Sequence, residues 1–250
     1  MTSARERLGF LRSVLIYYAT PFRLSQLQRL HRMFLHPGDL AFDLGAHVGN
    51  RIWAWRRLGV RVVALEPNPA FLGGLRRWFG RDPEVTLLGL AAGAVSGTAR
   101  LHISRMYPTV ASLSSEWIER VRTTPGFTRV RWEEQIEVAV TTLDHLIAKF
   151  GRPAFVKIDV EGFEAEVLRG LSQPLDALSF EYHAADPDTG AECLRLLGKL
   201  SRYSMNWTFG EAPRLRLDRW ASAEETAVFL RAIPPGVASG DIYARLAAPP

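Results

Sequence analysis

The residues with the clearest capacity for chemistry begin at residues 40–50, which read LAFDLGAHVGN. A short apolar run ends at Asp43, and Gly45 and Gly49 follow before a segment in which apolar residues recur at helical spacing. Glycine lets a backbone approach a ligand closely because no Cβ intervenes, and the N-terminus of a helix offers free N–H groups. This order predicts a nucleotide-binding turn. An ordinary strand–helix turn with incidental glycines is the alternative.

The turn differs from the G-x-G-x-x-G turn that binds dinucleotides. His47 occupies the position of the second glycine, and Gly49 falls one residue short of the third. A pyrophosphate therefore has poorer access, whereas a ligand with an amino-acid end suits the turn, with Asp43 placed for its ammonium group directly or through water. Glu66 ends the next apolar run, where a carboxylate can accept hydrogen bonds from two ribose hydroxyls. A ribose without pyrophosphate indicates S-adenosylmethionine; a solvated carboxylate at a strand end is the alternative for Glu66.

A second set of ionisable residues follows two later apolar runs. Lys157 and Asp159 belong to the first run and its end, Glu161 follows, and Glu181 and His183 end the next run. The carboxyl ends of parallel strands meet at the edge of the sheet where ligands bind, so we expect these groups to lie together. Asp159 is the first candidate for contact with an acceptor or for a general base. His183 is the second, because a neutral imidazole has the better unperturbed pKa.

Each of these residues also has a structural interpretation. Lys157 can pair with Asp159 or Glu161 and fix its orientation, which is the role we favour. His183 can be a surface histidine before a loop, and Glu164 can serve only to compensate the dipole of the next helix.

The acids also permit a divalent cation, since magnesium and calcium prefer oxygen ligands. Asp159, Glu161 and Glu181 would form its ligand set, but without a recognisable ligand loop no metal is predicted. The single Cys193 and the scattered histidines give no zinc spacing, and no serine lies in a G-x-S-x-G setting.

Apolar runs alternate with segments of helical spacing from residue 38 onward, which predicts a mostly parallel sheet with helices on both faces. Strands are expected at 40–44, 60–65, 85–90, 154–158, 177–183, 203–208 and 241–246, and helices at 49–58, 70–79, 143–150, 163–171, 188–201 and near 222–232. Two half-exposed strands, 98–104 and 135–140, enclose a long polar stretch. Long loops in compact domains are often functional, so the insertion at about 94–142 is expected to be a flap that faces the substrate.

The N-terminal segment, 1–37, is expected to be a helical extension of a domain that spans 38–250. Residues 4–36 have the pattern of two amphipathic helices broken at Pro21. Packing against the main domain is the favoured role, and contact with a membrane surface or closure over a ligand are the alternatives. Arg12 interrupts the apolar run that a signal peptide would need, and no apolar stretch approaches the roughly 20 residues that span a bilayer.

The composition is that of a globular protein and not of a disordered one, with 250 residues, 47% hydrophobic and 23% charged. The net charge of +5 tolerates anionic partners, but the chain has no run of five basic residues and no nucleic-acid-binding motif, so no nucleic-acid partner is expected. Cys193 alone cannot form an internal disulfide, which fits a reducing compartment and a cytoplasmic location. The oligomeric state is not predicted.

Three motifs resemble those of the FkbM-type S-adenosylmethionine-dependent methyltransferases. Two match the family's cofactor motifs, Asp43–Asn50 and Leu65–Pro69. The third is Thr142-Leu143-Asp144 followed by Val156–Glu164 and Val167-Leu168. The resemblance covers about residues 38–183. It implies a class I methyltransferase fold (Rossmann-like), S-adenosylmethionine as cofactor, and methylation of hydroxyl oxygens on sugars, glycolipids or polyketide-type metabolites.

Together these patterns predict an O-methyltransferase that acts on a hydroxyl of a small molecule, sugar or glycan. The predicted cofactor contacts are Asp43, Gly45, Ala46, Gly49, Asn50, Glu66, Pro67, Asn68 and Ala92, and the predicted catalytic residues are Asp159, His183, Lys157 and Glu161. A nucleic-acid methyltransferase is one alternative, although Asp159-Val160-Glu161-Gly162 differs from the Asn/Asp-Pro-Pro-aromatic run associated with methylation of base amino groups. A non-catalytic binding protein that uses the insertion for partners is the other.

Overall fold

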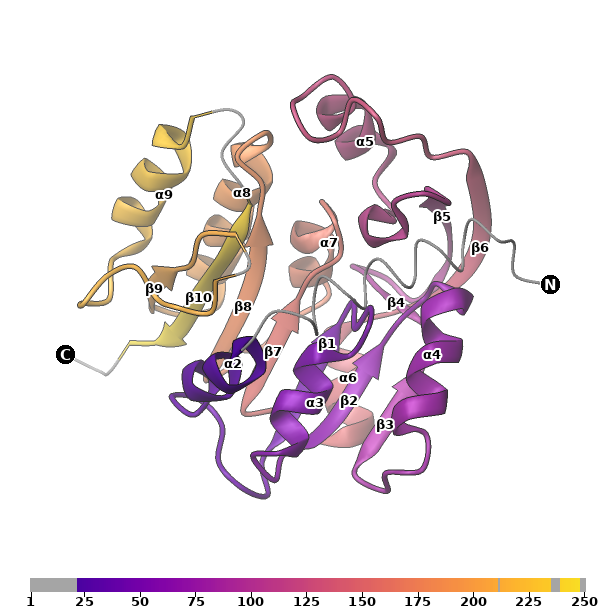
Figure 1. Cartoon of the computed structure of the whole chain (residues 1–250). Coiled ribbons are helices and arrows are strands. Elements are labelled where there is room, and N and C mark those ends of the chain that lie inside the picture. The colour runs from indigo at the N-terminus through magenta and orange to yellow at the C-terminus, as the bar shows by residue number, and fades with distance from the viewer. Residues whose placement is uncertain (1–21, 211, 235–238, 248–250) are drawn as a thin grey trace.

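The computed structural model describes residues 22–210, 212–234 and 239–247, and a seven-stranded sheet is its central element (Figure 1). The strands are β1 (Leu40–Leu44), β2 (Arg61–Leu65), β3 (Val85–Leu88), β7 (Phe155–Ile158), β8 (Ala177–Tyr182), β9 (Tyr203–Trp207) and β10 (Gly240–Leu246). Their order is β3-β2-β1-β7-β8-β10-β9, and only β10 runs antiparallel to its neighbours. The predicted class I methyltransferase fold is confirmed, and each predicted strand end lies within two residues of the observed one.

Helices cover both faces of this sheet because its central strands are apolar on both sides. Every residue of β1 is buried; Ala41 packs toward one face, whereas Leu40 and Phe42 pack toward the other. The first face is covered by α2 (Arg23–His31), α3 (Asn50–Arg56) and α4 (Pro69–Phe79). The second is covered by α6 (Leu143–Phe150), α7 (Glu164–Arg169), α8 (Pro187–Leu200) and α9 (Ala223–Ala232).

Side-chain caps begin several of these helices where the sequence places hydroxyl or amide residues. Thr142 accepts a hydrogen bond from the backbone N–H of His145 and caps α6. Asn68 caps α4 in the same way, and Ser222 forms a capping box with Glu225 at the start of α9.

The predicted insertion is more structured than its polar composition indicates. The two half-exposed strands predicted at 98–104 and 135–140 are confirmed, and a third strand joins them in a sheet of the order β4-β6-β5. Its strands are β4 (Ala91–Ala92), β5 (Gly97–Ile103) and β6 (Glu134–Thr141), and between β5 and β6 lie the 3₁₀-helix η1 (Pro108–Val110) and α5 (Ser115–Val121). The prediction missed α5 because its apolar face is short, with Trp117, Ile118 and Val121 buried against Phe127 and Trp132.

The second of the two predicted N-terminal helices is α2, while the first falls outside the described residues. Leu27 and Leu30 of α2 join the core on the α3 face, in line with the predicted packing against the main domain. Among the described residues, no helix has the length and apolar character needed to cross a bilayer.

An aromatic cluster fixes this α2 face to the sheet, and Phe155 of β7 lies at its centre. The Phe155 ring centroid is 5.1 Å from Phe34, 5.3 Å from His31 and 6.0 Å from Trp55, and the side chain is fully buried. Aromatic rings packed in this way contribute both buried area and specific ring geometry.

Phe155→Ala should therefore lower the free energy of unfolding by about 3–5 kcal/mol, because truncation leaves a cavity under α2. Urea denaturation followed by circular dichroism measures the change. Val228→Ala, at an exposed position of α9, is the control and should shift stability by less than about 0.5 kcal/mol. A loss below about 1 kcal/mol for Phe155→Ala would contradict this role for the cluster.

Candidate functional site

The turn after β1 brings its backbone against the turn after β7. Gly45 has φ +88°, and a Cβ at this position would lie 1.8 Å from the carbonyl oxygen of Asp159. Only glycine allows this approach. The backbone N–H of Asp159 also donates to the carbonyl oxygen of Leu44 at 2.9 Å. Gly45 thus allows the turn after β1 to pack directly against the turn after β7, where the predicted site residues meet.

His47, in place of the second glycine, holds a left-handed conformation with φ +49°. Its ring packs edge-on against Phe71 at 4.2 Å between centroids, and burial lowers its pKa to about 3, so the imidazole is neutral. Its backbone N–H donates to Oε2 of Glu66 at 2.8 Å. His47, the residue that distinguishes this turn from a dinucleotide-binding turn, therefore helps to fix the carboxylate of Glu66.

Glu66 is buried at the end of β2, with its carboxylate held from two sides. Oε2 accepts the N–H of His47 and Oε1 accepts the N–H of Asn68, both at 2.8 Å. Each oxygen therefore keeps acceptor capacity for one further donor. Burial outweighs these two hydrogen bonds and raises the pKa of Glu66 to about 7.

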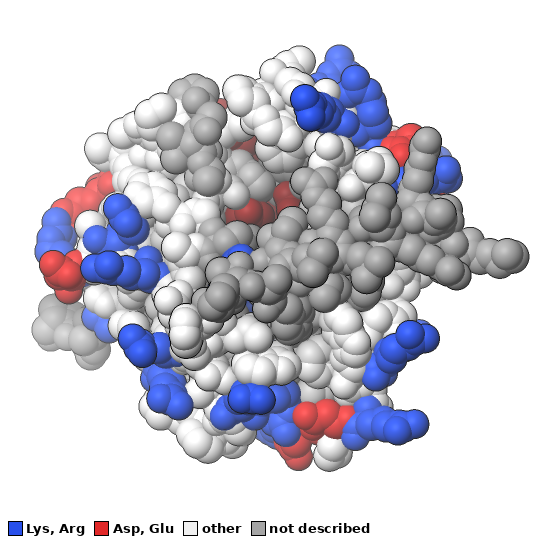
Figure 2. All heavy atoms as spheres, viewed as in Figure 1, with Lys and Arg blue, Asp and Glu red and all other residues white. Residues whose placement is uncertain are grey.

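One cavity joins Glu66 to the acids that follow β7. Glu66 lines it together with Asp159 and Glu161. Its remaining lining comes from the β1 turn, the start of α3, the end of β2, α4, the β4 segment, the insertion and the loop after β7. These residues are Gly45, His47, Asn50, Arg51, Leu65, Pro67, Phe71, Leu90, Ala91, Ala92, Leu101, Pro108, Thr109, Ala111, Leu113 and Val160. In Figure 2, acidic side chains lie deep in the centre of this face with a basic side chain close by, and most of the other visible Lys and Arg side chains are spread around its rim.

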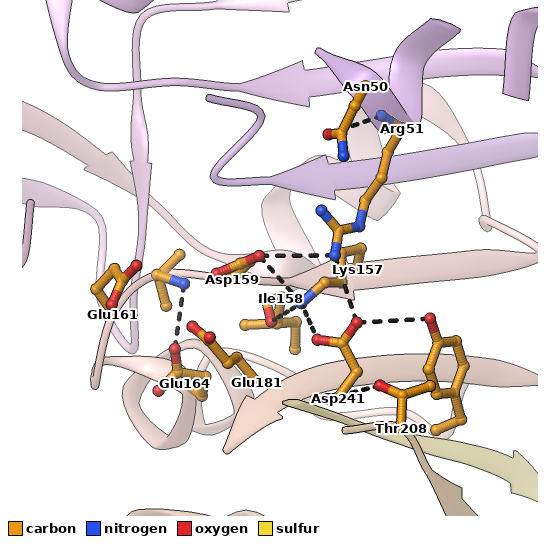
Figure 3. Close-up of polar contacts among 12 residues, drawn as sticks. Asn50, Arg51, Lys157, Ile158, Asp159, Glu161, Glu164, Glu181, Thr208 and Asp241 are labelled. Atoms are coloured by element: carbon orange, nitrogen blue, oxygen red, sulfur yellow. Dashed lines mark hydrogen bonds and ion pairs between the residues drawn. The ribbon is translucent and has the colours of Figure 1, made fainter. Parts of the chain in front are cut away.

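Lys157 is fully buried in β7 and forms the centre of an ion-pair network (Figure 3). Its Nζ lies 2.7 Å from Asp241 and 3.3 Å from Asp159, and it also donates to the carbonyl oxygen of Ile158 at 3.2 Å. Arg51 from α3 reaches the same two carboxylates at 3.3 and 3.8 Å. The predicted pairing of Lys157 with Asp159 is present, and Asp241 takes the place of the alternative partner, Glu161.

The network keeps Asp159 ionised. Burial alone would raise the pKa of Asp159, but the cations of Lys157 and Arg51 outweigh it and hold that pKa well below the usual range. The same balance applies to Lys157, since burial would lower its pKa while Asp159 and Asp241 hold it above the ordinary value. Asp159 is therefore a permanent negative charge at the cavity wall and a weak base.

Asp43 lies beside Lys157 in the register of β1 and β7, with its side chain buried. Burial raises its pKa to about 6, against the opposing effect of Arg51 and Lys157. Among the described residues its Oδ2 has no hydrogen-bond partner, and Asp43 does not line the cavity. Contact between Asp43 and a ligand ammonium group, directly or through water, remains a prediction.

Glu161, Glu181 and His183 form a second group next to the network. His183 Nε2 lies 3.4 Å from Glu181 and 3.6 Å from Glu161. The histidine is buried rather than on the surface, and its ring packs against Trp117 of the insertion at 5.1 Å. Burial would lower the pKa of His183, but Glu181 and Glu161 outweigh it and raise that pKa to about 10. This value makes His183 unsuited to act as a general base at neutral pH.

The loop that carries these acids is shaped by Glu164, at the start of α7. Its Oε1 accepts the backbone N–H groups of Val160 and Gly162 at 3.1 and 3.2 Å. The side chain is fully buried, so it does more than compensate the helix dipole. Glu161 within this loop has φ +52°, a conformation that non-glycine residues rarely adopt. Glu164 thus stabilises the bend that directs Glu161 to the cavity.

The structure brings only part of the predicted site to the cavity. The predicted residues that line it are Gly45, Asn50, Glu66, Pro67, Ala92, Asp159 and Glu161. The others, which lie behind or beside this lining, are Asp43, Ala46, Gly49, Asn68, Lys157 and His183. Asn68 and Lys157 act through neighbours, because Asn68 donates its N–H to Glu66 and Lys157 pairs with Asp159.

Sequence reasoning missed Arg51 and Asp241. Arg51 stands directly after the glycine turn, and its position on the first turn of α3 was a usable signal. Asp241 lies nearly 200 residues away at the start of β10. Its contact with Lys157 depends on β10 running antiparallel, which brings the beginning of that strand to the edge where the parallel strands end.

Curated relatives of this chain share part of its length. Hexuronic acid methyltransferase AglP of Haloferax volcanii is 28% identical over 155 residues, which are 60% of this chain and 58% of that protein. The 31-O-demethyl-FK506 methyltransferase FkbM of Streptomyces tacrolimicus is 30% identical over 171 residues, or 56% of this chain and 62% of that protein. The chain thus spans less than two thirds of the length of either relative.

Among solved structures, the precorrin-6y C5,15-methyltransferase of Geobacter metallireducens is similar, with 14% identity, a TM-score of 0.45, and coverage of 90% of this chain and 87% of that one. The family model described as the methyltransferase FkbM domain matches residues 43–205, about two thirds of the chain. The match includes the glycine turn, Glu66, the loop after β7 and the end of β8. The chain belongs to the FkbM methyltransferase domain family.

Proposed function

We propose that this chain is an S-adenosylmethionine-dependent O-methyltransferase that acts on a hydroxyl group of a small molecule, sugar or glycan. The observation that carries the proposal is the single cavity lined by Glu66 at one side and by Asp159 and Glu161 at the other. Family membership and the names of the two relatives, which refer to a hexuronic acid and to 31-O-demethyl-FK506, support the same function.

The residues around Glu66 fit the nucleoside part of the cofactor. The two carboxylate oxygens each have room for one more donor, which matches the two adjacent hydroxyls of a ribose. Phe71 and Leu90 add apolar lining near this carboxylate, which suits an adenine ring. His47 and Asn68 hold Glu66 by backbone N–H groups, so the carboxylate is oriented before a ligand arrives.

The acids after β7 fit the other end of the reaction. When bound, S-adenosylmethionine supplies a methyl group on a positively charged sulfur, from which an oxygen nucleophile takes the methyl carbon while the C–S electron pair stays on sulfur. Asp159, in the cavity wall, would accept a hydrogen bond from the acceptor hydroxyl and so orient its oxygen. That oxygen gains positive charge as the new C–O bond forms, so its proton becomes strongly acidic. Even a weakly basic carboxylate such as Asp159 can then take the proton.

The alternatives have less support. Most of the Lys and Arg side chains visible in Figure 2 are dispersed around the rim, whereas a nucleic-acid site needs them gathered along one surface. A non-catalytic binding protein would have no need for an ionised carboxylate in the wall of the same cavity as Glu66, which is where Asp159 lies. The insertion lines the cavity through Leu101, Pro108 and Leu113, which supports its role as a wall for the acceptor.

Glu66→Gln should weaken S-adenosylmethionine binding by about tenfold to a hundredfold at pH 8. Each of the two ribose hydrogen bonds contributes about 1.5–3 kcal/mol when the acceptor is charged but only about 0.5–1.5 kcal/mol when it is a neutral amide. Since the pKa of Glu66 is raised to about 7, affinity of the unaltered protein should also fall as the pH is lowered from 8 to 6, by up to about tenfold. Isothermal titration calorimetry measures both effects. Glu84→Gln, which changes an exposed carboxylate before β3, is the matched control. Preference for NAD over S-adenosylmethionine, or binding of neither, would refute the proposed function.

Asp159→Asn should reduce kcat by at least about a hundredfold while changing the S-adenosylmethionine Kd by less than about threefold. The reason is that the carboxylate acts on the acceptor and its proton. Methyl transfer would be measured with a radiolabelled methyl group on an acceptor found by screening uronic acids, other sugars and macrolides. Asp218→Asn, at an exposed position outside the site, is the control. Loss of cofactor affinity in Asp159→Asn would instead assign this residue to the cofactor.

A further inference from the structure

We propose that Glu161, Glu181 and His183 form a binding site for a divalent cation of the Mn²⁺ or Mg²⁺ type, which holds the acceptor beside the methyl group. The proposal rests on the proposed function for its catalytic role, but the binding of the ion does not depend on that function. It differs from the ligand set expected from the sequence, because His183 replaces Asp159.

The three side chains converge from two adjacent strand ends. One ligand atom from each lies within 4.8 Å of the others, and the histidine nitrogen is 3.4 and 3.6 Å from the two carboxylate oxygens. Neighbouring ligands of an octahedral ion with bonds of about 2.1 Å lie about 3 Å apart. Small rotations of the glutamate side chains would therefore bring the three atoms to coordination distance.

Unsatisfied buried atoms point to a ligand at this position. Within the described residues, Glu161 Oε2, Glu181 Oε2 and His183 Nε2 are all buried and have no hydrogen-bond partner. The His183 side chain is only 9% exposed. Buried polar atoms are nearly always satisfied in folded proteins, so three such atoms facing one another need a partner. A cation bound here would take the place of the proton that Glu181 and Glu161 hold on His183 Nε2, and it would satisfy all three atoms at once, whereas one proton on Nε2 satisfies two at most.

The environment separates this group from Asp159. Asp159 is already neutralised by Lys157 and Arg51, so it offers little to a second cation. Glu161, Glu164 and Glu181, in contrast, bring three buried or half-buried carboxyl groups around one imidazole. Two carboxylate oxygens and one imidazole nitrogen form a mixed set that Mn²⁺ accepts readily, and Mg²⁺ shares its preference for oxygen.

The ion would face the acceptor because Glu161 also lines the cavity that contains Asp159. Three protein ligands leave up to three positions of an octahedral ion open. Two neighbouring oxygens of one acceptor, such as vicinal hydroxyls or a hydroxyl beside a carboxylate, could occupy two of them. Coordination would lower the pKa of the hydroxyl to be methylated and fix its orientation. The inferred acceptor class is therefore one with a chelating pair of oxygens.

The test is a titration of the full chain with Mn²⁺ alone, after treatment with a chelator, with free Mn²⁺ measured by electron paramagnetic resonance. We expect one ion per chain, and Glu181→Gln and His183→Gln should each weaken binding by about tenfold or more, since each removes a ligand. Glu137→Gln, at an exposed carboxylate of β6, should leave binding unchanged. Failure to bind Mn²⁺ at millimolar concentration, or unchanged binding in both site variants, would overturn the proposal.

A second measurement needs no variant. Bound Mn²⁺ should broaden the indole N–H resonance of Trp117, whose ring packs on His183, more than that of Trp78 near the end of α4. Equal broadening of the two resonances would contradict the site.

Calorimetry with S-adenosylmethionine in the absence of metal separates the ion-site proposal from the proposed methyltransferase function. Mn²⁺ binding without cofactor binding refutes only the methyltransferase function, and cofactor binding without Mn²⁺ binding refutes only the ion site.

Discussion

The buried charge of Lys157 is the constraint around which the site is built. Removing an ammonium group from water costs several kcal/mol, so it must be balanced by close and well-oriented partners. Asp241, Asp159 and the Ile158 carbonyl oxygen supply them, from the start of β10 and the end of β7. Arg51 ties α3 to the same carboxylates. Lys157 thereby fixes the position of β10 relative to β7. Because Arg51 binds the same carboxylates, Asp241 and Asp159, α3 is held at this edge as well, where the ligand cavity opens.

This network divides the acidic groups of the site into two kinds. Asp159 faces two cations and remains ionised, which makes it a stable hydrogen-bond acceptor. For Glu161 and Glu181, burial and the neighbouring acids raise the pKa of both carboxyls, because the favourable effect of His183, to which Lys157 adds at Glu181, does not outweigh them. The protein therefore places a permanent charge and an incompletely satisfied acidic pair side by side. The first suits orientation of an acceptor, and the second suits a ligand that brings positive charge.

Local patterns in the sequence were enough to predict the parallel core and its ligand edge. The apolar runs predicted all seven sheet strands, and the position of Glu66 after β2 and of Asp159 after β7 followed from the rule that ligands bind at the carboxyl ends of strands. Pairing of Lys157 with Asp159 or Glu161 was also predicted, and Asp159 is the one observed. These features depend on short segments and on the topology of parallel sheets.

The remaining features depend on contacts between distant segments. Asp241 reaches Lys157 only because β10 reverses direction, and no local pattern encodes that. His183 is buried because Trp117 of the insertion covers it, and Trp117 lies in the stretch between the two predicted strands of the insertion, where no helix was predicted. Gly162, with φ +86°, permits this contact, since a Cβ there would lie 2.1 Å from the Trp117 ring. The sequence therefore identified the acids of the site but not the contacts that distant segments supply, namely Asp241 with Lys157 and Trp117 with His183.

A crystal structure of the complex with S-adenosylhomocysteine would test the central claim most directly, because that claim is an orientation of the cofactor in one cavity. The account predicts both ribose hydroxyls within hydrogen-bond distance of Glu66, with the sulfur on the side of Asp159 and Glu161. A nucleoside bound in the reverse orientation, with adenine against Asp159, or bound outside the cavity, would contradict it.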